Sequence, residues 1–286
     1  MAEAGSEAWR EGVVDARSVE LSANAVLRLA IAKLASGGNG IAQRALDAAL
    51  GWSELLIPTG APAQGDPVIS LRGGEIALVA FSHRAAVWRW IDQAELVCRV
   101  EPAMRVVGRA LERDVAGIAL DPSGDGNGGV IVPRTALAAV AEGSAQQSAE
   151  AGDNLALRLA VDAARSQESA LAHEALREAL LNGRALVPAR PTAAGGEDHD
   201  RLRFPTDPVT GEPVLVAFSD REALGGGPPA TGGDAVVMTG RGVVDTVTER
   251  GFSALVLNPG EAGAVVVPAP DVQRMAERLQ PRPEPD

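Results

Sequence analysis

The chain has 286 residues, of which 46% are hydrophobic and 22% charged, as in an ordinary globular protein. Its formal net charge of −12 disfavours nucleic acids and anionic membrane surfaces as partners, because most of the protein surface would repel them. Uninterrupted apolar runs fall short of the ~20 residues that a membrane-spanning helix needs. The N-terminus lacks the pattern of a secretory signal, and a single cysteine, Cys98, excludes an intrachain disulfide. We therefore expect a cytoplasmic protein.

Two helices are expected first, because apolar residues recur at helical spacing in "VLRLAIAKLA" and "IAQRALDAAL". Asn24 is a candidate N-cap of the first helix. Three short strands follow, "ELLIP", "VISLR" and "EIALVAF", and then a helix that begins after Ser82. A strand containing Cys98, the helix "AMRVVGRALERD", a hairpin and a last helix from Pro133 complete the first half.

The second half repeats the same order. The segment "NAVLRLAIAKLA" matches "NLALRLAVDAAR", "IALVAFSHR" matches "PVLVAFSDR", and "VAGIALDP" matches "FSALVLNP". The unit is far longer than a solenoid repeat, which indicates two tandem domains. We expect these at residues 18–142 and 153–280, with a linker at 143–152 and a disordered tail at 281–286.

Helices alternate with strands over the later part of each half, which predicts α/β layer packing. Hairpins within that part indicate a mixed sheet, so each domain is expected to be a mixed α+β unit. The predicted architecture is therefore two tandem copies of a mixed-sheet domain flanked by helices, each with an N-terminal helical pair.

The hairpin "LDPSGDGNGGVIVP", residues 120–133, raises the question of a bound ion or phosphate. Counting from Asp121, an EF-hand loop would need a glutamate where Val132 stands. A phosphate-binding loop would need Lys and Ser or Thr after its last glycine, where Val130 follows. The second copy also lacks secure counterparts of Asp125 and Asn127. A strand–turn–strand connection is the preferred interpretation, with a metal site as the alternative.

Polar residues with catalytic potential do not recur as a set in the two halves. Ser82 and Ser219 follow strands where a nucleophile could stand, but neither lies in a G-x-S-x-G motif, and Ser219 with Glu222 forms a predicted capping box. The histidines His83, His173 and His199 form no metal-binding pair at helical spacing. Cys98 is expected to be a small buried hydrophobe, with a sulfurtransferase-like nucleophile as the alternative. We predict no catalytic, cofactor-binding or metal-binding residues.

The two halves differ most after "VAFS". The first has "HRAAVWRWIDQAE", a helix with Trp88 and Trp90, whereas the second has a short helix followed by a Gly/Pro-rich loop. A buried stripe of Ala86, Val87, Trp90, Ile91 and Ala94 would point Trp88 elsewhere. Trp88 and Arg89 are therefore candidate partner-binding residues, although internal packing of both tryptophans is the alternative.

The segment "PVLVAFSDREAL … GFSALVLNPGEAGAVVVP", residues 213–268, resembles the N-terminal domain of the SseB family, named for enhanced serine sensitivity. The resemblance rests on the strand ending in Phe218 and Ser219, on "LNPG" and on the strand ending at Pro268. The first half resembles the family more loosely, through "VAFS" and "LDP", with Asp121 in place of the motif's Asn. The family motifs are structural and bring no catalytic set, and the composition suits a high-GC bacterium.

These observations favour a cytoplasmic, non-enzymatic tandem-domain binding protein of the SseB type that requires no cofactor. Its partner, a protein or a small ligand, is not identified by the sequence. The alternative is a hydrolase- or sulfurtransferase-like enzyme with its active site in a cleft between the repeats.

Overall fold

The computed structural model describes residues 13–15, 24–59, 66–90, 97–123, 129–143, 153–166, 169–189, 202, 204–207, 210–226, 234–260 and 263–279. The chain divides into two compact units, residues 1–145 and 146–286, here called the first unit and the second unit. The predicted mixed α/β class is confirmed in both. Among the helices in these ranges, none has the length and apolarity to cross a membrane.

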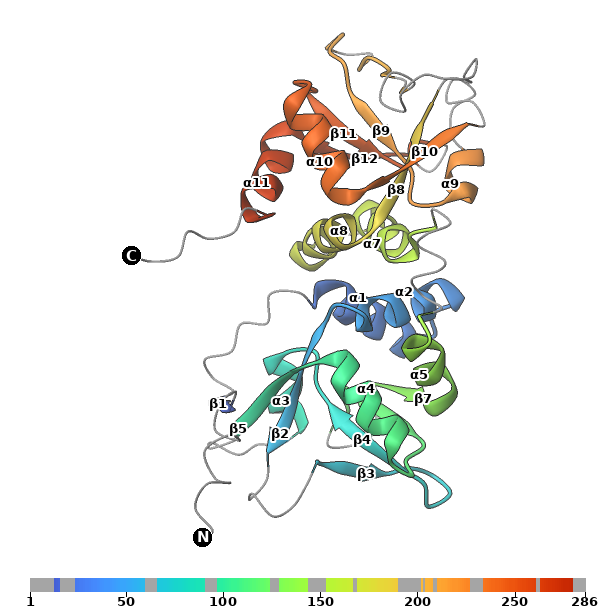
Figure 1. Ribbon diagram of the computed structural model, residues 1–286, viewed down its shortest axis with the longest axis vertical. Coiled ribbons are helices and arrows are strands. Elements are labelled where there is room, and N and C mark those ends of the chain that lie inside the picture. The colour runs from blue at the N-terminus through green and yellow to red at the C-terminus, as the bar shows by residue number, and fades with distance from the viewer. Residues whose placement is uncertain are drawn as a thin grey trace. The chain divides into compact units, whose positions relative to one another are not determined.

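The first unit combines five helices and seven strands over its described residues (Figure 1). The helices are α1 (Ala25–Ala35), α2 (Gly40–Leu50), α3 (Arg84–Trp90), α4 (Ala103–Glu112) and α5 (Arg134–Ala141). The strands are β1 (Val13–Asp15), β2 (Glu54–Thr59), β3 (Val68–Ser70), β4 (Ile76–Ala80), β5 (Val97–Pro102), β6 (Gly117–Leu120) and β7 (Val130–Pro133).

These strands form two sheets. One has the antiparallel order β1-β5-β2, and the other has the order β3-β4-β6-β7, in which only β4 and β6 run parallel. A bridge between Leu56 and Phe81 joins the two sheets. The pair α1 and α2 packs together at one end of the strands, as Figure 1 shows. This arrangement places the carboxyl ends of β4 and β6 side by side.

The second unit follows the same order of elements. Its helices are α7 (Leu155–Ser166), α8 (Ala170–Asn182), α9 (Arg221–Gly225), α10 (Gly240–Glu249) and α11 (Ala269–Leu279). Its strands are β8 (Arg184–Pro188), β9 (Leu215–Ala217), β10 (Ala235–Thr239), β11 (Ala254–Leu257) and β12 (Val265–Pro268).

The pairing in the second unit mirrors that in the first. Strand β10 pairs with β8 as β5 pairs with β2, and the order β12-β11-β9 matches β7-β6-β4, again with one parallel pair. A bridge between Leu186 and Phe218 corresponds to the one between Leu56 and Phe81. Strand β1 has no counterpart among the described residues of the second unit.

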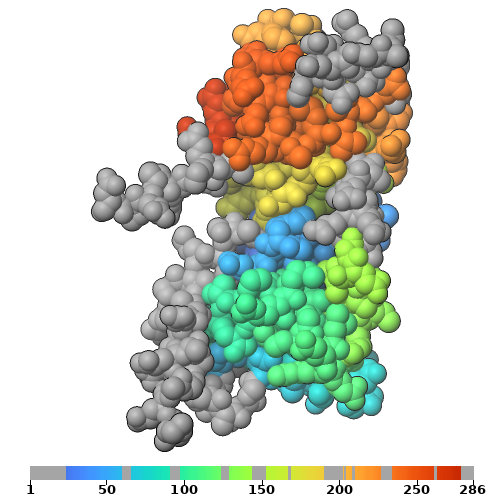
Figure 2. All heavy atoms as spheres, viewed as in Figure 1, coloured from blue at the N-terminus to red at the C-terminus, as the bar shows by residue number. Residues whose placement is uncertain are grey.

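Each core is centred on a phenylalanine at the end of a parallel strand. Phe81 is fully buried with Leu56, Val79, Val87 and Cys98. Phe218 is equally buried, among Leu186, Val214 and Val216. In the first unit, α4 packs against β2, β5 and β6, and its outer surface is in view in Figure 2. In the second unit, α10 packs against β8 and β10. Aliphatic side chains therefore build both cores, with few aromatic rings.

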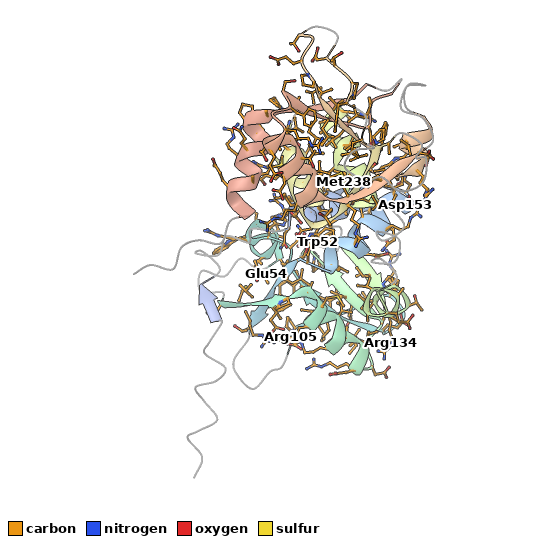
Figure 3. All side chains as sticks on the ribbon, turned by 45° about the horizontal axis from the view of Figure 1, so that its top comes forward. Trp52, Glu54, Arg105, Arg134, Asp153 and Met238 are labelled. Atoms are coloured by element: carbon orange, nitrogen blue, oxygen red, sulfur yellow. The ribbon has the colours of Figure 1, made fainter. Side chains whose placement is uncertain are left out.

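Arg134, labelled in Figure 3, ties the end of α4 to the start of α5. Its guanidinium donates to the carbonyl oxygen of Ala110 at 3.0 Å and also to those of Leu111 and Arg113. These carbonyls lie at the C-terminal end of α4, where a cation is favourable because the helix dipole is negative there.

Candidate functional site

In each unit, the polar residues that the sequence singled out meet at the carboxyl ends of the two parallel strands. Ser82 and His83 follow β4, and Asp121 follows β6; Ser219 and Asp220 follow β9, and Asn258 follows β11. Such strand ends are where ligands bind in open α/β sheets. We call the two sets the Ser82 network and the Ser219 network.

The Ser82 network brings a serine, a histidine and a carboxylate together. One oxygen of Asp121 accepts a hydrogen bond from the backbone amide of Ser82 at 2.7 Å, and the other accepts from the Ser82 hydroxyl. The same hydroxyl lies 2.9 Å from His83 Nδ1, which is 3.5 Å from the Asp121 carboxylate. Three residue types used in nucleophilic catalysis are therefore in contact.

Their connections differ from those of a catalytic triad. In a triad, one ring nitrogen of the histidine contacts the serine and the other contacts the carboxylate. Here the serine donates directly to the carboxylate, and the single ring atom Nδ1 faces both groups. Ser82 is also 0% exposed, so its hydroxyl cannot meet a substrate in this conformation. The geometry favours a structural role for this serine.

The Ser219 network uses the same positions with different chemistry. Asn258 Oδ1 accepts from the Ser219 amide at 2.7 Å, as Asp121 does in the first unit, and Asn258 Nδ2 donates to the Ser219 hydroxyl at 2.8 Å. The hydroxyl in turn donates to Asp220 at 2.7 Å. Ser219 is 0% exposed as well.

Each buried serine hydroxyl therefore donates to one carboxylate, supplied from a different strand end in each unit. In the first unit the carboxylate is Asp121 and the residue next to the serine is His83. In the second unit the carboxylate is Asp220, next to the serine, and the residue across the sheet is the neutral Asn258. A hydroxyl has one proton to donate, so one carboxylate satisfies it. The first unit therefore differs from the second at both 83 and 121, and the two differences compensate for each other because each unit keeps one carboxylate for its serine.

Asp121 and Asn258 share an unusual backbone conformation that explains the residue type. Their φ angles are +52° and +46°, and no other described non-glycine residue has positive φ. Asp and Asn tolerate this left-handed region better than other residues with a Cβ. The turn aims each side chain back at the serine amide, which accounts for the "LDP" and "LNP" motifs.

The predicted capping box at Ser219 is wrong. The N-cap of α9 is Asp220, whose side chain accepts from the amide of Ala223 at 2.8 Å. Ser219 lies one residue too early because Asn258 holds its amide at the end of the strand. The carboxylate of Glu222 instead pairs with Arg158 Nη1 at 2.9 Å.

Asn24 is the N-cap residue of α1, as predicted, but its side chain has another role. Asn24 precedes α1, but its side chain makes no capping hydrogen bond. Its Nδ2 donates to the carbonyl oxygens of Glu54 and Ser82, each at 2.6 Å. Asn154 does cap, since its Oδ1 accepts from the amide of Leu157, and its own backbone amide donates to the carbonyl of Ser219. Both asparagines therefore fasten the first helix of their unit to the serine.

Charged groups surround the Ser219 network. Arg158 on α7 contacts Asp220 at 3.1 Å as well as Glu222, and the hydrogen bond that Arg158 donates to Glu222 is the largest cause that raises the pKa of Arg158. Burial raises the pKa of the nearby Asp162 carboxyl, against the lowering effect of Arg158 and Arg165.

Part of this ionic environment is particular to the second unit. Arg165 also donates to the carbonyl of Asn258. The repeat aligns Ala32 and Ala35 of α1 with Asp162 and Arg165 of α7, so the first unit lacks both charges at these positions.

A second divergence lies between β5 and α4 in the first unit. Asp66 and the buried Glu101 pair there with three arginines, Arg99, Arg109 and Arg113. In the second unit, strand register puts Val236 at the position of Arg99 and Met238 at that of Glu101, so these two charges have no counterpart there. Phe204 and Phe252 of that unit pack with ring centroids 4.8 Å apart, with Arg250 over Phe204.

Cys98 is a core residue, as the sequence interpretation preferred. It is 0% exposed, and burial raises the pKa of its thiol to about 11. Strand register makes Ala235 its counterpart, because Cys98 pairs with Pro58 and Ala235 with Pro188. A thiol that stays protonated near neutral pH is a poor nucleophile.

The remaining sequence candidates are dispersed. His173 lies exposed on α8, and its Nδ1 contacts the carbonyl of Ser169. His199, Asp125 and Asn127 lie outside the described residues, as do most of the predicted linker and the tail at 281–286. Within the described ranges, groups of three or more His, Cys, Asp or Glu able to hold a metal ion are absent.

Helix α3 carries both Trp88 and Trp90. Trp90 packs on Phe81 with ring centroids 5.4 Å apart, beside the buried Ala86 and Val87. Trp88 is half-buried and Arg89 is exposed, while Ile91 and Ala94 of the predicted stripe lie outside the described residues. At this place the described residues of the second unit form the five-residue helix α9, and a short helix was predicted here.

A comparison with protein families gives a match within the second unit. Residues 157–274 match the family model described as the SseB protein N-terminal domain. The match runs from α7 into α11 and includes the whole Ser219 network. Searches of curated proteins and of solved structures gave no match.

Proposed function

We propose that the protein is a non-enzymatic binding protein of the SseB type, in which both units are copies of the SseB N-terminal domain. The family match at 157–274 supports this assignment for the second unit. The first unit shares its strand pairing, its bridge to the core phenylalanine, and a serine held by a left-handed Asp or Asn. These shared features support the second copy.

The hydrogen-bond pattern of the two serines supports a binding role over catalysis. A hydrolase built on the contacts among the described residues of the first unit would use Ser82, His83 and Asp121. That serine is inaccessible, and its counterpart Ser219 makes equivalent bonds without a histidine. A network kept for structure needs the amide and hydroxyl bonds but not the imidazole.

The partner surface that we propose is the outer side of α3, with Trp88 and Arg89 at its centre. The observation that carries it is the contact between Trp90 and Phe81, since Trp90 supplies the ring that the core requires. With 3.6 residues per turn, Trp88 projects about 160° away from Trp90 around α3. Trp88 is half-buried and Arg89 beside it in the chain is exposed, and Trp and Arg dominate the energetics of many interfaces. The short α9 offers no equivalent surface.

Site-specific photo-crosslinking tests this surface. We expect a benzophenone amino acid at position 89 to yield a discrete protein adduct in cells of the source, and the adduct to disappear when Trp88→Ala is added. Arg105, an exposed residue of α4 labelled in Figure 3, is the matched control position and should give no such adduct. Equal adducts at 89 and 105, or an adduct that survives Trp88→Ala, would contradict the proposal.

A further inference from the structure

The strand β10 in the second unit has an edge whose counterpart in the first unit is covered. There, β1 pairs antiparallel with β5, Val14 lying opposite Cys98. Strand β10 corresponds to β5, but among the described residues it pairs with β8 alone. The same fold is thus seen once with an added strand and once without it.

The backbone of β10 presents hydrogen-bonding groups on this edge. Asp234 accepts from the amide of Ala189, and the amide of Gly240 donates to Gly183, so even-numbered residues face β8. Backbone groups alternate along an antiparallel strand, which turns the amides and carbonyls of Ala235 and Val237 outward. Ala235 is the counterpart of Cys98, the residue that β1 pairs with.

The side chains on β10 do not protect the edge. Natural edge strands are blunted by lysines, prolines or bulges. Strand β10 reads Ala-Val-Val-Met-Thr, with Val237 38% exposed, and Met238, labelled in Figure 3, is 8% exposed. Among the described residues this edge is apolar and carries none of these blocking features, and such an edge is a template for strand addition.

We infer that β10 binds an extended segment of a partner protein, which adds to the second unit as β1 adds to the first. The register of β1 sets the chemistry of that segment. Val13 lies opposite Arg99 and Asp15 opposite Val97. The corresponding residues of the second unit are Val236 and Asp234, so an apolar residue would face Val236 and a basic residue would face Asp234.

The same register disfavours the chain's own N-terminal segment as the occupant. In a second copy, Asp15 would face Asp234, and like charges directly opposite each other destabilise a strand pair. This segment is also already paired with β5 in its own unit. The partner is therefore a different protein, and the site is independent of the surface proposed around Trp88.

Peptide binding to the full chain tests the inference. The probe is a fluorescein-labelled peptide of residues 10–18 carrying Asp15→Lys, and its unsubstituted version is the control. Fluorescence anisotropy should show saturable binding of the probe, with the unsubstituted peptide at least about fivefold weaker at low salt because of Asp234. Ala235→Pro removes an outward amide and should weaken probe binding by about tenfold or more.

Matched variants separate this edge from other sites. Val266→Pro removes an outward amide from the other edge strand, β12, where Val266 is 56% exposed, and should leave probe binding unchanged. Trp88→Ala should also leave it unchanged, so this test stands apart from that of α3. Val237→Pro serves as the second edge variant if circular dichroism shows that Ala235→Pro does not fold.

Three outcomes of the peptide experiment would overturn the inference. The first is a lack of saturable binding up to about 1 mM protein, which corresponds to a binding free energy weaker than about −4 kcal/mol. The second is binding that persists in both β10 variants. The third is equal binding of the two peptides. A concentration-dependent dimer that Ala235→Pro abolishes would make a second copy the occupant instead, and would also overturn it.

Discussion

Replacing Asp121 tests whether the Ser82 network is held by geometry or by charge. Asp121→Ala removes the acceptor of the Ser82 amide at 2.7 Å and the acceptor of its hydroxyl. A buried amide left without a partner costs about 1–3 kcal/mol. Alanine at φ +52° adds about 1–2 kcal/mol. We therefore expect Asp121→Ala to lower the free energy of unfolding of the first unit by about 2–5 kcal/mol.

Asp121→Asn is the matched variant, because Asn258 occupies the same position in the second unit. Asparagine keeps the acceptor for the Ser82 amide and tolerates the left-handed backbone, and its Nδ2 can donate to the hydroxyl as Asn258 does. The hydroxyl can then donate to His83 Nδ1, 2.9 Å away. We expect a loss below about 1 kcal/mol.

Urea unfolding followed by tryptophan fluorescence measures both variants. All 4 tryptophans lie in the first half of the chain, at positions 9, 52, 88 and 90, so the signal reports on the first unit. If Asp121→Asn costs as much as Asp121→Ala, the carboxylate charge rather than the geometry holds the network. If Asp121→Ala costs less than about 1 kcal/mol, the hydrogen bonds described for Ser82 do not stabilise the fold.

Three further predictions concern the tryptophans, the thiol and the division into units. Trp88→Ala should cost well under the ~3–5 kcal/mol expected for a packed core site, whereas Trp90→Ala should cost about 2–4 kcal/mol; equal losses in urea melts would show that Trp88 is core. The raised pKa of Cys98 means that the unfolded thiol loses its proton first. Stability should therefore fall between about pH 9 and pH 11, by at most about 3 kcal/mol, and Cys98→Ala should abolish that part of the pH dependence. Residues 1–145 and 146–286, expressed separately, should each unfold cooperatively; loss of cooperative melting in both would mean that the two units share one core.

Local patterns predicted most of the elements. Helical spacing of apolar residues identified α1, α2, α7 and α8, and the alternation of strands with helices indicated a mixed sheet. The Gly/Pro-rich loop that begins a few residues after Ser219 predicted the short α9. These predictions hold because helix periodicity, glycine and proline act over a few residues and need no distant partner.

The candidate site shows where such reasoning fails. The capping box assigned to Ser219 followed a valid local rule, yet Asn258, which is 39 residues away, takes the serine amide and moves the cap to Asp220. Likewise the side chain of Asn24 serves Glu54 and Ser82 rather than its own helix. In both cases a hydrogen bond to a residue distant in the chain replaces the local one.

The sequence by itself determined the repeat, the fold class and the residues at which the halves differ, since these follow from composition, periodicity and self-similarity. Only the tertiary structure decided what those differences mean. The exchanges at 83 and 121 are coupled because β4 and β6 run parallel and end side by side. The edge of β10 stands out because β1, distant in the chain, covers its counterpart. Contacts of this kind depend on strand register, which the pattern of a single strand does not contain.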